Sequence, residues 1–436
     1  MTRAFMIGAP RSGSGKTMLT LGLQRAFRLL GRSVAGLKSG PDYIDPAFHA
    51  AATGRAGLNL DSWAMSPELI AGLAARAAAG ADLIIAEASM GLFDGVPAPP
   101  GRSGASADIA ALLGLPVILL VDVSGQAQSA AAVVKGCASY DPRLRVAGVV
   151  LNRVASPRHA RLTRDAVEAL GIPVLGCVPK LATLVLPERH LGLVQAEELP
   201  DLDKWLDVMA EAIASHVDLK ALEALAAPLT PMAATPLRAL KPPGKNIALA
   251  RDAAFSFFYP HHLTSWREAG ANLHYFSPLA DEAPPEHCDV CWLPGGYPEL
   301  HAEKLSQSRS FLGGLRRFAQ TRPVHGECGG YMLLGASLAG ADGVAHKMAG
   351  LLELETSFAA RKLNLGYRIA ELCVSGPLGR AGQRFKGHEF HYATIVKRGD
   401  DPPFAEVSDA YGAPPAYAGS KRGHVTGSFF HIVAEE

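Results

Sequence analysis

The chain has 436 residues, of which 48% are apolar, and its 42 basic and 41 acidic residues leave a formal net charge of +1. This balance predicts neither a nucleic-acid nor a membrane partner, so we expect small-molecule ligands. The length allows two or three domains. Six scattered cysteines are typical of a reduced, cytoplasmic protein. No apolar run is long enough to predict a targeting or membrane segment.

From residue 4 to about residue 180, short apolar runs alternate with alanine-rich helical stretches. This rhythm predicts an α/β fold with a parallel sheet covered by helices on both faces. Ligands of such sheets bind beyond the carboxyl ends of the strands. Several predicted strands end there in a polar residue, namely Lys38, Glu87, Asp122 and Asn152. We therefore expect a nucleotide site at this edge.

A proline-rich stretch without helical periodicity, residues 226–244, separates two α/β series. We predict an ATP-dependent domain over 1–225, a linker over 226–244 and a second α/β domain over 245–436. The later strands of the second series have no long helices between them, so part of that sheet is predicted to be antiparallel. No repeat relates the two halves.

The segment "APRSGSGKT", residues 9–17, ends in the Gly-Lys-Thr of a Walker A phosphate loop. Backbone amides of such a loop hold phosphates, while its lysine contacts the phosphates and its hydroxyl contacts Mg²⁺. Pro10 stands where the standard pattern has glycine, but the strand before and the helix after favour ATP binding. The predicted nucleotide-binding residues of the loop are Ser12, Gly13, Gly15, Lys16 and Thr17.

Charged residues follow the second and third predicted strands. Lys38 is followed by Asp42 and Asp45, and Glu87 ends the third strand. Mg²⁺ prefers carboxylate and phosphate oxygens, and a carboxylic acid that ATP activates needs cations to neutralise the developing charge. We therefore predict that Thr17, Asp45 and Glu87 bind Mg²⁺ and that Lys38 contacts the nucleotide.

Four segments together carry a specific resemblance: "APRSGSGKT", "KSGPDYIDPAFH", "EASMGLFDG" and "LPERHLGL", the last over 186–193. They resemble the corrinoid amidotransferases, in particular the cobyrinic or hydrogenobyrinic acid a,c-diamide synthases, whose ATP domain is similar to dethiobiotin synthetase. The resemblance implies that Asn152 contacts the adenine. It further implies that Glu87 helps to activate the substrate, together with four substrate-binding residues: Asp42, Tyr43, Ile44 and Asp94.

The stretch "HGECGGYML", residues 325–333, places Cys328 on a tight turn. A thiolate attacks an amide carbonyl when a turn exposes it, backbone amides bind the oxyanion and a histidine takes its proton. "GSFFH" near the C-terminus supplies His431 as that base. The predicted oxyanion residues are Gly295 and Gly296 in "LPGGYPEL", and Gly329 after the cysteine.

This order and spacing resemble the class I, or triad, glutamine amidotransferase domain over 245–436. The resemblance implies that glutamine is hydrolysed through a thioester and that ammonia is released. Val433 stands where triad members usually carry a glutamate, so we expect a Cys-His pair with weaker glutaminase activity. Glu435 and Glu436 are the candidates to replace the missing acid.

Other polar pairs receive a structural interpretation. Cys288 and Cys291 have redox spacing, but a strand pattern contains them, so we interpret them as structural rather than redox or metal-binding. His388 and His391 in "GHEFHY" do not fit the spacing of a zinc helix, and we interpret them as structural or substrate-contacting residues.

The two halves together predict a glutamine- and ATP-dependent ligase. It would amidate the a and c carboxylates of hydrogenobyrinic or cobyrinic acid through a phosphorylated carboxylate and internally channelled ammonia. One alternative is amidation of other corrin carboxylates by a cobyric acid synthase. Two alternatives from other classes are a partition-type ATPase switch, whose signature lysine is replaced here by Arg11, and a binding protein with a vestigial amidotransferase half. The resemblance also implies a homodimer.

Overall fold

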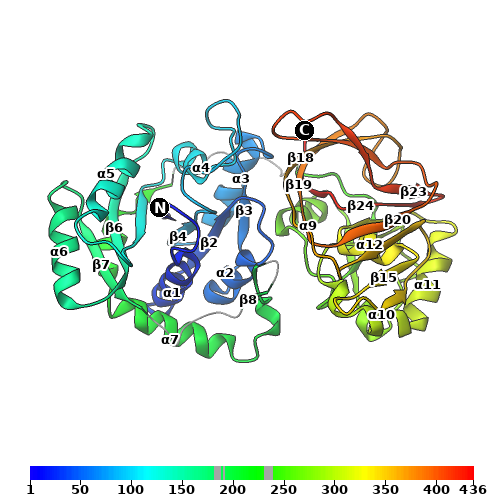
Figure 1. Ribbon diagram of the computed structural model, residues 1–436, viewed down its shortest axis with the longest axis horizontal. Helices are drawn as coiled ribbons and strands as arrows, with labels where there is room; N and C mark the ends of the chain where they lie inside the picture. The colour runs from blue at the N-terminus through cyan, green and yellow to red at the C-terminus, as the bar shows by residue number, and fades with distance from the viewer. Residues whose placement is uncertain (181–187, 190–191, 230–238) are drawn as a thin grey trace. The chain divides into compact units, whose positions relative to one another are not determined.

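The computed structural model describes residues 1–180, 188–189, 192–229 and 239–436. The chain divides into two compact units, Met1–Thr235 and Pro236–Glu436 (Figure 1). The segment 186–193, which carries part of the resemblance, lies outside the described residues except for two short paired strands, β8 (Glu188–Arg189) and β9 (Gly192–Leu193). Among the described helices, none is long and apolar enough to cross a membrane.

The first unit is built on one sheet of strand order β3-β2-β4-β1-β5-β6-β7. All of these pairs are parallel, and β10 adds an antiparallel partner to β1. The strands are β1 (Arg3–Gly8), β2 (Val34–Ser39), β3 (Leu58–Leu60), β4 (Leu83–Glu87), β5 (Val117–Asp122), β6 (Val146–Val154), β7 (Val174–Pro179) and β10 (Ala227–Pro228). The predicted parallel sheet is confirmed.

Helices cover this sheet because its central strands are apolar on both faces: every residue of β2, β4 and β5 is buried. Leu19, Leu23 and Phe27 of α1 pack with Met209 and Ile213 of α7 in one core cluster. The helices are α1 (Lys16–Leu29), α2 (Asp45–Thr53), α3 (Pro67–Ala78), α4 (Ser106–Leu113), α5 (Ala130–Tyr140), α6 (Pro157–Glu168), η1 (Ala196–Glu198), α7 (Leu202–Ala214) and α8 (Leu219–Leu225).

The second unit contains a six-stranded sheet of order β12-β11-β13-β14-β24-β23, parallel except for β23. Its strands are β11 (Asn246–Ala250), β12 (Asn272–Phe276), β13 (Val290–Leu293), β14 (Val324–Glu327), β23 (Ser420–Arg422) and β24 (Val425–Ser428). The helices of the unit are α9 (Pro260–Glu268), η2 (Pro278–Ala280), η3 (Pro298–Leu300), α10 (Ala302–Gln307), α11 (Arg309–Ala319) and α12 (Gly329–Leu334).

Two further sheets complete the second unit. A five-stranded sheet of order β22-β21-β18-β19-β25 is antiparallel throughout, which confirms the predicted antiparallel part. A four-stranded sheet has the order β16-β15-β17-β20. Their strands are β15 (Ser337–Ala339), β16 (Ala345–Lys347), β17 (Leu354–Ser357), β18 (Asn364–Leu372), β19 (Arg384–His391), β20 (Thr394–Arg398), β21 (Ala405–Asp409), β22 (Ala416–Ala418) and β25 (His431–Glu435).

Candidate active site

The phosphate loop joins β1 to α1 and depends on two glycines with left-handed backbone. Gly13 has φ 72° and Gly15 has φ 95°, conformations that side chains disfavour. A Cβ on Gly15 would lie 2.6 Å from the Asn152 amide nitrogen. That nitrogen donates to the Ser14 carbonyl over 2.7 Å, and the Asn152 Oδ1 accepts from the Arg153 amide over 2.9 Å. Asn152 therefore braces the loop, and its contact with adenine stays a prediction.

Lys16 begins α1 with its ammonium held by backbone carbonyls. Its Nζ donates to the carbonyls of Met90 and of Arg11, the latter over 3.4 Å. Burial, followed by the nearby Lys38 charge, lowers the pKa of Lys16 to about 8. Because carbonyls are neutral acceptors, an anionic phosphate would be a stronger partner for this ammonium.

A buried cluster of charges forms where β2, β4, α1 and α2 meet. The Lys38 ammonium contacts Asp45 Oδ2 at 2.5 Å and Glu87 Oε1 at 2.9 Å. Thr17, one residue after the loop lysine, donates its hydroxyl to the same Glu87 oxygen over 2.7 Å. The structure thus brings together Thr17, Lys38, Asp45 and Glu87, as expected from their positions at the strand ends.

The two carboxylates of this cluster are held in opposite electrostatic environments. Burial and the neighbouring Asp42 raise the pKa of Asp45. Burial would also raise the pKa of Glu87, but the Lys38 charge and a hydrogen bond from His49 outweigh it and lower that pKa. Hydroxyl and carboxylate oxygens are the donor set that a hard divalent cation takes, so these residues fit Mg²⁺.

His49 also belongs to this cluster, although no sequence motif indicates it. Its Nε2 lies 2.8 Å from Glu87 Oε2, and both side chains are fully buried. Gly36 in β2 makes the approach possible, because a Cβ there would lie 2.7 Å from the His49 Cβ. Asp45 and His49 lie four residues apart on α2 and therefore on one face of the helix, and this spacing is the only sign of the pairing that the sequence carries.

The predicted substrate residues lie in the loops around this cluster. Asp42 Oδ1 accepts from the backbone amides of Ile44 and Asp45, at 2.8 and 3.0 Å, and so orders the start of α2. Asp94 Oδ2 accepts from the Gly91 amide over 2.7 Å. These contacts shape the loops, and substrate binding by Asp42, Tyr43, Ile44 and Asp94 stays a prediction.

In the second unit, Cys328 occupies a strained turn between β14 and α12. Its backbone has φ 47° and ψ −101°, which is rare for a residue with a side chain. The Cys328 amide donates to the Ser428 carbonyl on β24 over 2.8 Å, so the neighbouring strand holds the turn. Strain of this kind concentrates at functional sites, where the surrounding structure maintains it.

Glycines allow the backbone and the predicted base to approach this cysteine closely. A Cβ on Gly329 would lie 3.1 Å from the Gly296 amide nitrogen, so these two backbone segments are in contact. A Cβ on Gly295 would lie 2.6 Å from His431 Cε1 and 3.4 Å from Cys328 Cβ. The structure therefore brings together all five residues predicted for the glutaminase site.

Burial sets the charge of the Cys-His pair. Burial, followed by the nearby Glu299, raises the pKa of the Cys328 thiol. Burial, followed by the nearby His388, lowers the pKa of His431 well below its usual range. Both groups are consequently neutral at pH 7. A thiolate must then form by proton transfer within the site.

His388 lies against the ring of His431, the predicted base. The His388 and His431 rings stack with centroids 5.0 Å apart and an interplanar angle of 15°. The His388 Nε2 is in turn hydrogen-bonded to the Tyr259 hydroxyl at 2.8 Å. His391 instead stacks on Phe429 at 3.8 Å, a packing contact.

At Val433, where triad members usually carry a glutamate, the backbone carbonyl binds two histidines. The Val433 carbonyl accepts from Nε2 of His261 at 3.0 Å and from Nε2 of His262 at 2.9 Å. Both histidines are buried at the start of α9, and burial lowers the pKa of each, that of His262 to about 4. Two neutral imidazoles thus hold the strand that carries His431.

The two terminal acids contact residues other than Cys328 and His431. The Glu435 carboxylate accepts from Gln383 over 2.6 Å, and the Glu436 carboxylate pairs with Arg384 at 3.0 Å. Glu327, directly before Cys328, is a buried acid that no sequence motif indicates. Its Oε1 accepts from the Ile432 amide over 3.4 Å, and burial raises its pKa to about 8.

Comparisons with known proteins match both units. Residues 5–194 match the family model of the CobQ/CobB/MinD/ParA nucleotide binding domain, and residues 246–436 match that of the CobB/CobQ-like glutamine amidotransferase domain. A hydrogenobyrinate a,c-diamide synthase of Mesorhizobium japonicum is 57% identical over 99% of this chain and 98% of that protein. The chain belongs to the hydrogenobyrinate a,c-diamide synthase family.

Other members of that family are similarly close. The synthase of Agrobacterium fabrum is 55% identical and that of Rhodobacter capsulatus 56% identical, each over 99% of both chains. Membership confirms the predicted enzyme class, a glutamine-hydrolysing ligase, and the predicted pair of α/β domains. A partition-type switch and a vestigial binding protein receive no support from these relatives, since the similarity runs through both units.

Proposed function

We propose that this chain amidates the a and c carboxylates of hydrogenobyrinate, with glutamine as the nitrogen donor and ATP as the energy source. The observation that supports the proposal is that one chain holds both a phosphate loop beside a carboxylate cluster and a strained cysteine beside a histidine. The full-length similarity to synthases named for hydrogenobyrinate favours that acid over cobyrinic acid and over the substrates of cobyric acid synthases.

The glutaminase half works through residues whose contacts are set by the fold. His431 takes the thiol proton of Cys328, and the thiolate attacks the amide carbonyl of glutamine. The backbone amides of Gly296 and Gly329 hold the oxyanion. Ammonia leaves with the proton from His431, and water then hydrolyses the thioester to release glutamate.

The ligase half holds the triphosphate and the substrate acid. Lys16 exchanges its carbonyl partners for phosphate oxygens, and Lys38 neutralises the charge that develops as a substrate carboxylate attacks the terminal phosphate. Mg²⁺, when bound by Thr17, Asp45 and Glu87, would shield the phosphate charge. Ammonia then displaces phosphate from the activated carboxylate to give the amide.

His388 acts as a positioning residue in place of the triad glutamate. A neutral histidine in stacking contact holds the His431 ring but offers no carboxylate to stabilise an imidazolium. This arrangement accounts for the expected weak glutaminase activity, because the acid normally stabilises the charge on the histidine as it accepts a proton.

The proposal also includes a cellular compartment and an oligomeric state. All six cysteines are free thiols, which suits a reduced compartment such as the cytoplasm. We also propose a homodimer, as the resemblance implies. Sedimentation velocity at micromolar concentration would show a dimer, and a single species of monomer mass would refute this part.

The test of the proposal is mass gain by hydrogenobyrinic or cobyrinic acid with ATP, Mg²⁺ and glutamine. We expect two amidations of hydrogenobyrinic acid by the wild-type enzyme. Cys328→Ser should lose the glutamine-dependent reaction by at least about 1,000-fold and keep the reaction with free ammonia. ATP hydrolysis without mass gain in either acid would refute the assignment of the substrate.

A further inference from the structure

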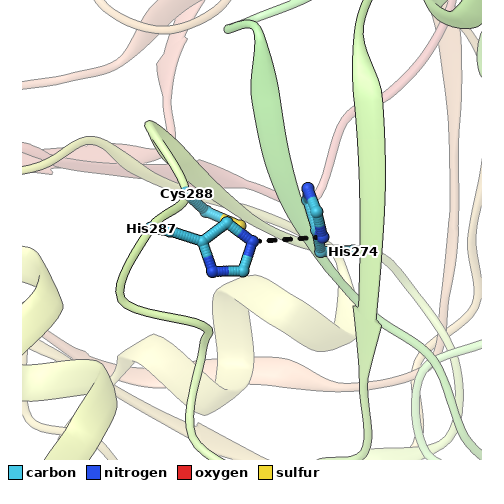
Figure 2. A group of neighbouring side chains, drawn as sticks. All are labelled: His274, His287 and Cys288. Carbon is cyan, nitrogen blue, oxygen red and sulfur yellow. Dashed lines mark hydrogen bonds between the residues drawn. The ribbon is translucent and has the colours of Figure 1, made fainter.

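Three side chains that the proposed reaction does not use gather in the second unit. His274 lies on β12, and His287 and Cys288 lie shortly before β13. Their potential ligand atoms all lie within 4.8 Å of one another. Figure 2 shows the two imidazoles and the sulfur grouped together. Within the described ranges, this is the one group of three or more His, Cys, Asp or Glu side chains placed in this way.

The spacing of the two imidazoles matches that of two ligands on one metal ion. The His287 Nε2 and the His274 Nδ1 lie 3.2 Å apart, and the rings are nearly perpendicular at 85°. Two nitrogens bound to one tetrahedral Zn²⁺ lie about 3.3 Å apart, since each Zn–N bond is about 2.0–2.1 Å long. In the hydrogen bond seen here, one of the two nitrogens must already present a bare lone pair.

The burial of the three side chains leaves one side of the group open. Cys288 is buried with 2% of its surface exposed, His274 is half-buried, and His287 is exposed. His274 Nε2 is buried and has no hydrogen-bond partner among the residues that the structure describes. Either nitrogen of His274 can therefore accept a metal, Nδ1 as the ring stands and Nε2 after a ring rotation. A cation would reach the group from the His287 side and keep a solvent molecule.

This group is separate from the glutaminase site. Strands β13 and β14 are parallel neighbours. Cys288 precedes the beginning of β13, whereas Cys328 follows the end of β14. The two cysteines therefore lie at opposite ends of neighbouring parallel strands. Cys291, the other half of the redox-like spacing, lies inside β13, is fully buried and does not belong to the group.

We propose that His274, His287 and Cys288 bind a divalent cation of the zinc class, with water as the fourth ligand. Two imidazoles and a thiolate favour Zn²⁺ or Co²⁺ over the hard cations Mg²⁺ and Ca²⁺, which prefer oxygen ligands. The thiol proton of Cys288 passes to solvent as the metal–sulfur bond forms. The bound ion would tie β12 to the turn before β13.

Cobalt absorption tests this site directly on the full-length, metal-stripped protein. Titration of the wild type with Co²⁺ should give a near-ultraviolet thiolate-to-cobalt band that saturates at one equivalent and disappears when Zn²⁺ is added. Cys288→Ser should abolish the band. His287 is exposed, so we expect His287→Ala to fold normally. This variant should weaken Co²⁺ binding by at least about 10-fold.

Matched controls separate this site from other thiols and histidines. Cys373→Ser removes a free cysteine of the same unit, His424→Ala removes an exposed histidine, and Cys328→Ser removes the glutaminase nucleophile. All three should keep the wild-type titration. A band that survives in Cys288→Ser, one lost in Cys328→Ser, or a wild type without any band would overturn the proposal.

Discussion

At the residue scale, the Tyr259 hydroxyl supports His431, the proposed base, through His388. The hydroxyl holds His388, on which the His431 ring stacks. Tyr259→Phe keeps the ring packing but removes a hydrogen bond worth about 1 kcal/mol. We expect the glutaminase kcat to fall about 5-fold with KM for glutamine unchanged, because His431 is less well positioned.

Steady-state glutaminase kinetics and ammonia-dependent amidation check this expectation together. The ammonia reaction should be unaffected in Tyr259→Phe. Tyr275→Phe is the matched control, since its hydroxyl also has a hydrogen bond, from Arg267 over 2.8 Å, but lies at an exposed position. Equal kinetic losses in the two variants would show that Tyr259 has no positioning role.

Glu327 provides a prediction about pH. Burial raises its pKa to about 8 in the folded state, against about 4.3 for an exposed glutamate. The folded protein therefore holds a proton that the unfolded chain releases between these values, and this contribution to stability is lost as the pH rises through them. The loss is roughly 1.4 kcal/mol for each pH unit of the window.

Glu327→Gln should accordingly flatten the pH dependence of stability between pH 5 and pH 8. Denaturant unfolding of the wild type and the variant across this range measures the effect, with the difference in favour of the variant growing toward high pH. Parallel curves for the two proteins would contradict the assignment of a protonated Glu327.

At the element scale, α2 presents Asp45 to Lys38 near the end of β2 and His49 to Glu87 at the end of β4. Asp45 begins the helix, and His49, one turn later, contacts Glu87. His49→Phe keeps a ring of similar size but leaves a buried carboxylate oxygen without its partner. We expect ATP-dependent amidation to fall by about 10–100-fold, as for other residues that orient ligand groups.

The glutaminase activity of the same His49→Phe protein is its internal control. It should remain at the wild-type level, because Cys328 and His431 belong to the other compact unit. A parallel loss of both activities would indicate general unfolding rather than a role at the carboxylate cluster.

The packing of α12 gives a second prediction at this scale. A Cβ on Gly330 would lie 2.0 Å from the Leu293 carbonyl oxygen, so Gly330→Ala must push the helix away from β13. We expect this substitution to destabilise the second unit by several kcal/mol, roughly 3 or more, and to abolish glutaminase activity.

Gly313→Ala is the matched control for that substitution. Gly313 lies in the middle of α11, and a Cβ there would meet only the end of the flexible Arg317 side chain, at 3.6 Å. We expect a stabilisation of about 0.5–1 kcal/mol from higher helix propensity. Thermal unfolding compares the two, and a destabilised Gly313→Ala together with a normal Gly330→Ala would refute this explanation of the packing.

At the scale of the whole molecule, we expect that a substitution in one site abolishes the activity of that site and leaves the activity of the other site intact. Lys16→Ala removes the buried ammonium of the phosphate loop, so we expect amidation with glutamine and with free ammonia to fall by at least about 1,000-fold. Glutamine hydrolysis by the same protein should persist. Cys328→Ser should instead lose glutamine hydrolysis and keep amidation with free ammonia. If Lys16→Ala kept ammonia-dependent amidation, the phosphate loop would not be the ligase site.

The sequence was sufficient to predict most of the fold and to nominate most of the residues proposed for the two sites. Apolar periodicity predicts the parallel sheet because both of its faces are covered, and the Gly-Lys-Thr and "GECGG" segments predict their turns because a tight turn needs glycine at particular positions. Such signals are local. The residues they identify, Lys16 and Cys328 above all, lie where the patterns place them.

Only the tertiary structure decided which distant side chains meet. His49 and Glu87, Tyr259 and His388, and His274 and Cys288 are pairs from different elements, and their contact depends on sheet order and helix packing. Burial has the same origin: it sets the neutral state of Cys328 and His431. The sequence by itself therefore determined the family and the enzyme class and predicted the principal residues, while the partners and charges of those residues arise from the packing of the folded chain.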